Sequence, residues 1–210
     1  MRNTNARKQK ILQILAETYH GTTTALTYSS PFELLVAVVL SAQCTDVRVN
    51  MITGRLFPKY NTPGEMLALG EERLAELIRD CGLYRAKASN LIKTCAILCE
   101  EYGGSVPDSF AQLIKLPGVG RKTANVLLSQ LFNVPAIAVD THVFRVAKRL
   151  GLANGLTPEK VEFELMQAIP QQDWSAAHHW LIWHGRKVCK AKSPGCLACP
   201  LSGVCPRVGI

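Results

Sequence analysis

The chain has 210 residues, of which 48% are hydrophobic and 19% charged, enough apolar material for a packed core and too much for a disordered chain. Its longest uninterrupted apolar run, Leu34–Leu40, is too short to cross a bilayer, and the basic N-terminus has no signal-type apolar segment. These features argue against a membrane-spanning or secreted protein, and we expect a cytoplasmic one.

Helical patterns follow one another along nearly the whole chain. Capping boxes predict helix starts at Ser30 and Thr62, each followed by Pro at the first helical position and Glu three residues after the cap. Thr157 precedes a Pro and an early acid and marks another start. The pattern predicts helices over roughly 6–18, 31–42, 45–56, 71–79, 85–102, 109–114, 119–131, 140–150, 158–168 and 175–188. Only 135–139 reads as a strand, so we expect an all-α fold with an internal boundary at 133–139.

A glycine turn at 116–124, Leu-Pro-Gly-Val-Gly-Arg-Lys-Thr-Ala, precedes one of these helices. Gly118 and Gly120 would let the backbone N–H groups at the helix start approach an anion such as a phosphate. Lys122 lies in the first helical turn, where the helix dipole, burial and neighbouring Arg121 would favour a neutral, nucleophilic amine. The simpler interpretation is a phosphate-binding lysine.

Asp140 stands at the head of a later predicted helix, in the sequence Val-Asp-Thr-His. A carboxylate there can stabilise a developing positive charge and assist proton transfer. It can also be a plain N-cap, and the two roles are compatible.

The net charge of +8 is unevenly distributed. The range from Lys115 to Arg149 contains six Lys and Arg residues and one acidic residue, and the range from Arg186 onward contains five and none. By contrast, Glu65–Asp108 contains eight acidic residues. Basic patches of this kind indicate a polyanionic partner, although charge alone also fits a merely basic, soluble surface.

Four of the eight cysteines lie close together near the C-terminus, with six, two and five residues between them: Cys189, Cys196, Cys199 and Cys205. A structural zinc site usually has two close Cys pairs, whereas only one Cys-x2-Cys pair occurs here, which favours a larger iron–sulfur centre. Zinc and unligated thiols are the alternatives. A centre there would hold the intervening Lys192 in place for phosphate contact. We interpret the remaining four, Cys44, Cys81, Cys95 and Cys99, as small buried apolar residues.

The glycine turn, the Val-Asp-Thr-His motif and the terminal cysteine spacing together resemble the endonuclease III family of helix-hairpin-helix, iron–sulfur DNA glycosylases with lyase activity. The segments Leu40–Asp46, Cys81–Tyr84 with Lys87-Ala88, and His178–Arg186 add to the resemblance, which runs from about residue 8 to residue 205.

The resemblance implies two α-helical domains with a central DNA-binding cleft. One is a six-helix barrel, here 24–134, which contains the helix-hairpin-helix; the other joins 1–23 to 135–210 and holds a 4Fe-4S cluster on the four terminal cysteines. The implied partner is double-stranded DNA with a damaged base or an abasic site, bound by a monomer, without a membrane and associated with the nucleoid.

The implied reaction is excision of oxidised pyrimidines followed by strand cleavage. Lys122 is the implied nucleophile, and Asp140, on the opposite side of the sugar, would stabilise the sugar's positive charge and assist the proton transfers of the lysine. The resemblance also implies that Gln43 and Leu83 fill and wedge the gap left by the extruded base. From the sequence alone, Leu83 reads as a core leucine. The remaining expected DNA contacts are Leu116, Gly118, Gly120, Arg121, His142, Arg145 and Lys192. A salt-bridged surface arginine is the alternative for Arg145, and we expect His178, His179 and His184 to be packing residues rather than ligands.

Three rival functions are weighed against this one. The adenine-specific mismatch glycosylases of the same superfamily and the monofunctional glycosylases lack a lysine matching Lys122. A DNA-binding module or redox sensor without catalysis would not need Lys122 and Asp140 together.

Overall fold

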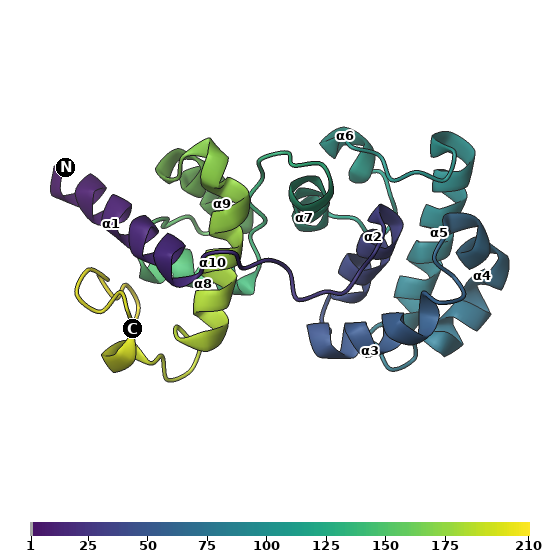
Figure 1. Cartoon of the computed structure of the whole chain (residues 1–210), viewed down its shortest axis with the longest axis horizontal. Helices are drawn as coiled ribbons and strands as arrows, with labels where there is room; N and C mark the ends of the chain where they lie inside the picture. The colour runs from purple at the N-terminus through teal and green to yellow at the C-terminus, as the bar shows by residue number, and fades with distance from the viewer. Residues whose placement is uncertain (1) are drawn as a thin grey trace. The chain divides into compact units, whose positions relative to one another are not determined.

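The computed structural model of the chain describes residues 2–210, which are all-helical and contain no strand. The expectation of an all-α fold is confirmed. The helices divide between two compact units (Figure 1). The internal unit is Ala25–Asn133, and the terminal unit joins the segment through Thr24 to Val134–Ile210.

The internal unit is built around one mostly apolar helix that is buried on every side. This helix, α2, runs from Pro31 to Leu40, and all of its residues after Pro31 are buried. It packs against helices on several sides, including α3, α5 and α7, which explains why its sequence shows no polar face. The other helices of this unit are α3 (Asp46–Leu56), α4 (Pro63–Leu77), α5 (Tyr84–Tyr102), α6 (Phe110–Leu113) and α7 (Arg121–Leu131).

The capping boxes begin helices where the sequence predicts. At Thr62 the box is complete, because its hydroxyl accepts from the Glu65 N–H while the Glu65 carboxylate accepts from the Thr62 N–H. At Ser30 only the first half forms, since the Glu33 carboxylate accepts from the N–H and hydroxyl of Ser29 instead. The helix behind Thr62 is kinked at Gly70, where φ is 72°, so the expected 71–79 helix is its second half and ends at Leu77.

The terminal unit packs helices from both ends of the chain around one core. The helices are α1 (Arg2–Thr18), α8 (Thr141–Arg149), α9 (Pro158–Ala168) and α10 (Trp174–Lys187), with the short 3₁₀ turns Gln171–Asp173 and Cys196–Ala198. Ile11 and Leu15 of α1 lie in the same buried cluster as Val143 and Val146 of α8 and Leu181 of α10. The N-terminal helix therefore belongs to the unit formed mainly by the C-terminal part of the chain.

The predicted strand over 135–139 is wrong. Residues 136–139 are buried, as their apolar character demands, but no neighbouring strand pairs with them. The carbonyl oxygen of Ala138 is instead hydrogen-bonded by a side chain, since it lies 2.7 Å from His178 Nδ1. The stretch is a buried connector that leads into α8.

Candidate active site and nucleic-acid interface

The turn between α6 and α7 requires glycine at one position. Gly118 has a φ of +81°, and a Cβ there would lie 3.2 Å from the Asn90 Cβ of α5. The Val119 N–H donates to the Leu116 carbonyl at 3.0 Å, and the Thr94 hydroxyl donates to the Pro117 carbonyl at 3.0 Å. The turn is thus closed on itself and fixed to α5.

The start of α7 carries no side-chain cap. Gly120 is the N-cap residue, its side-chain position faces open space, and Gly120, Arg121 and Lys122 are all exposed. The Arg121 guanidinium lies over the Phe110 ring, 5.3 Å from its centroid. A helix start without a capping side chain and with cations on its surface is suited to an anion.

One expectation for this turn needs correction. Lys122 is exposed rather than buried, so burial does not act on its amine. Leu116 is only 2% exposed, so its side chain belongs to the core of the turn, and a contact of this residue with DNA stays a prediction.

Asp140 is the N-cap of α8 in the terminal unit. Its Oδ1 accepts from the Val143 N–H at 2.7 Å, which fixes the orientation of the carboxylate. The helix begins immediately after a buried connector, so the position of the carboxyl group is set on both sides.

Arg145 joins α8 to α10 and the first terminal cysteine. Its guanidinium donates to the carbonyl oxygens of Gly185 at 3.0 Å and Cys189 at 3.1 Å, and it lies 3.3 Å from His142 Nδ1. Its acceptors are carbonyls, so the alternative of a salt-bridged surface arginine is wrong. Gly185 permits the approach of the two helices, because a Cβ there would lie 3.0 Å from Val146 Cγ2.

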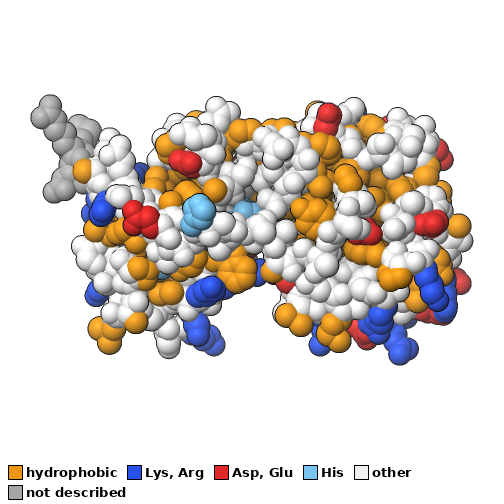
Figure 2. Space-filling model, in the orientation of Figure 1, with side chains coloured by type: hydrophobic (Ala, Val, Ile, Leu, Met, Phe, Trp, Pro, Cys, Tyr) orange, Lys and Arg blue, Asp and Glu red, His pale blue; other side chains and the backbone are white. Residues whose placement is uncertain are grey.

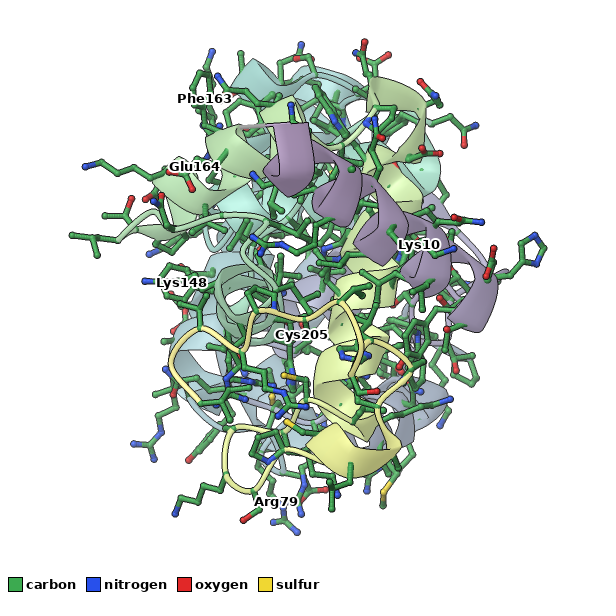
Figure 3. All side chains as sticks on the ribbon, turned by 90° about the vertical axis from the view of Figure 1, so that its left-hand side faces the viewer. Lys10, Arg79, Lys148, Phe163, Glu164 and Cys205 are labelled. Carbon is green, nitrogen blue, oxygen red and sulfur yellow. The ribbon has the colours of Figure 1, made fainter. Side chains whose placement is uncertain are left out.

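The four terminal cysteines line one pocket at the end of α10. Figure 3 shows sulfur atoms gathered inside the C-terminal loop near the labelled Cys205. Backbone N–H groups of Leu201 and Arg207 donate to the sulfurs of Cys199 and Cys205, each at 3.4 Å. Burial raises the pKa of both thiols, and the other cysteines of the pocket add to that effect. Among residues 2–210, no three His, Cys, Asp or Glu side chains are grouped as a single metal ion requires.

Arg149 of α8 holds the chain between the first two cysteines. Its guanidinium donates to the carbonyls of Lys190 at 2.7 Å and Ala191 at 3.1 Å and reaches the Cys189 sulfur at 3.5 Å. Lys192 follows directly and is exposed. In Figure 2, Lys and Arg side chains gather over the end of α10 at the lower edge of this unit. In the sequence Arg149 is only one more basic residue, and no pattern there predicts this contact.

The three histidines of α10 are buried, as expected of packing residues. His184 accepts or donates on both sides, with Nδ1 3.0 Å from the Tyr19 hydroxyl and Nε2 3.8 Å from the Cys199 sulfur. Burial lowers the pKa of His179 and of His184 to about 4, so both are neutral at physiological pH.

Gln43 and Leu83 lie on two exposed loops of the internal unit. Both have left-handed backbones, with φ of 53° and 59°. Leu83 is 59% exposed, so it is not a core leucine. Cys95 is buried as an apolar residue of α5, with Cys99 half-buried on the same helix. Cys81 is also buried, but its sulfur accepts a hydrogen bond from Lys87 at 3.0 Å, a contact that the sequence analysis missed.

The chain is similar to known DNA repair proteins along nearly its whole length. Residues 36–171 match the model of the HhH-GPD superfamily base excision DNA repair protein family. The endonuclease III of Rickettsia conorii is 54% identical over 196 residues, 93% of each chain, and that of Escherichia coli K12 is 50% identical over 200 residues, 95% of each. A solved endonuclease III, trapped as a covalent intermediate with DNA, superposes with a TM-score of 0.90 at 51% identity, covering 95% of this chain and 96% of that one. In residues 2–210, no helix is both long and apolar enough to span a membrane.

Proposed function

Because the chain belongs to the HhH-GPD superfamily of base excision DNA repair proteins, and within it to the endonuclease III family, we propose that Lys122 and Asp140 are its catalytic residues. As a member of this family it is a DNA glycosylase and AP lyase that acts in base excision repair. Its proposed substrate is double-stranded DNA with an oxidised pyrimidine or an abasic site, bound by a monomer in the cytoplasm. The internal unit is the proposed barrel domain, and the terminal unit the proposed cluster domain.

The observation that carries the proposal is Lys122 itself, exposed in the first turn of a helix whose start has no capping side chain. Its amine attacks C1′ of the damaged nucleotide, and the base leaves with the electrons of the glycosidic bond. The C1′–O4′ bond then opens, O4′ takes a proton to become a hydroxyl, and C1′ and the amine form a Schiff base. Removal of a C2′ proton then expels the 3′ phosphate and cuts the strand. A related endonuclease III has been captured as a covalent intermediate with DNA, which supports this route.

Asp140 is proposed to stabilise the cationic sugar as the base leaves and to assist the proton transfers of Lys122. Its N-cap bond to the Val143 N–H uses Oδ1 and holds the carboxylate in one orientation. A pre-oriented negative charge stabilises a developing cation without reorganising at the moment of reaction.

DNA binding is proposed to rest on backbone contacts. The start of α7 offers N–H groups beside Gly118 and Gly120 to a phosphate, which positions the duplex without reading sequence. Exposed Arg121 and Lys192 add positive charge, while His142 lies in the first turn of α8 with the Arg145 guanidinium 3.3 Å from its Nδ1. Gln43 and Leu83 are proposed to occupy the space left by the extruded base.

The terminal cysteines fit a 4Fe-4S cluster. All four line one pocket, and N–H groups of the chain point at three of the four sulfurs. Such N–H···S bonds are typical of iron–sulfur ligands. When bound, the cluster would cross-link a loop that otherwise has few buried residues. Arg149 and the cluster would then together fix the loop that presents Lys192.

Borohydride trapping tests the proposed reaction. The protein is incubated with a duplex oligonucleotide that contains thymine glycol, and borohydride reduces any Schiff base to a stable adduct. We expect an adduct with the native chain, and also with Lys115→Ala, an exposed lysine of the same hairpin. Lys122→Ala should give none. Failure of the native chain to form an adduct on damaged or abasic DNA would refute the proposal.

A further inference from the structure

A lysine lies buried beneath the two loops that carry Gln43 and Leu83. Lys87 of α5 is only 5% exposed. Its ammonium group donates to the Leu40 carbonyl at 2.9 Å, to the Ala42 carbonyl at 2.6 Å and to the Cys81 sulfur at 3.0 Å. An ammonium group has three N–H donors, so the three acceptors satisfy it completely.

The acceptors belong to the two loops. Leu40 is the last residue of α2, and Ala42 is in the turn that leads from it to Gln43. Helix C-termini present carbonyl groups without helical partners and the negative end of the dipole, which a cation stabilises. Cys81 stands two residues before Leu83 in the other loop.

Cys81 completes the link between the loops. Its thiol donates to the Leu40 carbonyl at 3.2 Å while its sulfur accepts from Lys87. Burial raises the pKa of the Cys81 thiol, which keeps it neutral and able to donate. The thiol and the lysine therefore hold the end of α2 and the start of the Leu83 loop together.

The loops also meet directly. A Cβ on Gly82 would lie 3.3 Å from the Gln43 carbonyl, so the backbones of the two loops are nearly in contact. Gln43 and Leu83, on either side of this approach, both adopt the left-handed conformation that non-glycine residues avoid unless their surroundings impose it. The backbone N–H of Lys87 donates to the Leu83 carbonyl at 3.0 Å, and this bond fixes Leu83 to the start of α5.

We propose that Lys87 is a positioning residue, which with Cys81 sets the spacing and the backbone conformation of Gln43 and Leu83 so that both enter the gap of an extruded base. This proposal rests on the proposed function, since it assumes that the two side chains act on the duplex. Lys87 itself is buried away from the substrate and acts through the loops.

The test compares Lys87→Met with Lys93→Met, an exposed lysine on the same helix. Single-turnover base excision is measured on thymine glycol in a fully paired duplex and on the same lesion in a single strand. Unstacking and unpairing a base is expensive only in the duplex, so we expect Lys87→Met to slow duplex excision about tenfold and single-strand excision less than about twofold. Lys93→Met should match the native chain on both.

A second comparison asks whether Lys87 acts through the two loops. In a chain that already carries Gln43→Ala and Leu83→Ala, adding Lys87→Met should slow duplex excision by less than about twofold, because coupled residues are not additive. A full tenfold additional loss would overturn the proposal. Equal slowing on duplex and single strand in the otherwise native chain would overturn it as well, since it indicates general damage to the fold.

Cys81→Ala covers the case in which Lys87→Met does not fold, because it leaves the lysine and two of its acceptors in place. Its duplex excision should fall about threefold with single-strand excision unchanged, in line with the loss of the two weak hydrogen bonds that the thiol makes. Native rates on both substrates would overturn the proposal. A native chain that forms no borohydride adduct would instead refute the proposed function, so the two failures are distinguishable.

Discussion

The two helices that carry the proposed catalytic residues begin in opposite ways. Helix α7 starts at Gly120 with no capping side chain, and Lys122 stands exposed in its first turn. Helix α8 starts at Asp140, whose own carboxylate caps it at 2.7 Å. One start is left open to an outside anion, whereas the other already holds an anion of the chain.

This difference matches what each helix is proposed to meet in DNA. An open helix start can take a phosphate, and a lysine there is brought to the sugar beside that phosphate. A capped start cannot take a phosphate, but it presents a fixed negative charge that suits a sugar becoming positive. Helices α5 and α10 also begin without a capping side chain, but at α7 such a side chain would compete with the proposed phosphate.

The largest expected effect separates the two roles of Asp140. Asn is as good an N-cap as Asp, so Asp140→Asn should unfold at the same denaturant concentration as the native chain. Base excision in a single turnover should nevertheless slow by about 10²–10⁴, because the negative charge is gone. Asp140→Ala, the matched control, should lose both stability and excision. Native excision by Asp140→Asn would reduce Asp140 to a cap.

Closing the open start of α7 should trade DNA affinity for stability. Gly120 has extended backbone angles and open space at its side-chain position, so Gly120→Asp can adopt the capping geometry. We expect the free energy of unfolding to rise by a few tenths of a kcal/mol. DNA affinity should fall about tenfold, because one charge-assisted contact to phosphate is lost and a negative charge is added.

Gly120→Ala is the control for this change, since it adds a Cβ without a capping group. Its DNA affinity, measured by fluorescence anisotropy at fixed salt, should stay within about twofold of native. Equal affinity losses for the two variants would contradict the idea that the open helix start is the phosphate site.

The smallest expected effect is a change of the free energy of unfolding with pH, and its source lies in the terminal unit. All five histidines lie outside the internal unit. Burial lowers the pKa of His179 to about 4, below its unfolded value near 6.5, so the unfolded chain binds more protons between these values. Stability is therefore present above pH 6.5 and is lost as pH falls toward 4.

When the pH falls from 7 to 5.5, the burial of His179 should lower the free energy of unfolding by about 1 kcal/mol. Denaturant unfolding of the native chain and of His179→Gln at both pH values measures the difference. The variant should be less sensitive to pH by that amount. The same pH dependence in both chains would show that burial of His179 does not control it.

Helix starts were the part of the fold that could be predicted best, because Thr62 and Thr157 cap helices through local contacts alone. The prediction of a strand over 135–139 is wrong, because an apolar run in the sequence does not show whether another strand lies beside it. The units also join segments distant in the chain, since Ile11 packs with Leu181, and only the family resemblance indicated such a division.

Contacts made through backbone carbonyls were hidden from the sequence. Nothing in the sequence predicts that the side chains of Arg149 and Lys87 are held by carbonyl oxygens far away in the chain. One signal was available for Lys87, since it stands four residues before Leu91 on the apolar stripe of its helix. Leu83 gave no such signal, because its exposure depends on a left-handed loop.

The central claim is that the amine of Lys122 bonds to the sugar, and peptide mapping of the trapped adduct tests it most directly. After borohydride reduction, nuclease digestion and trypsin, mass spectrometry locates the residual sugar. The account predicts that it sits on Lys122 and that trypsin no longer cuts after this residue. A sugar on Lys115, on the N-terminal amine or on any other lysine would contradict the account.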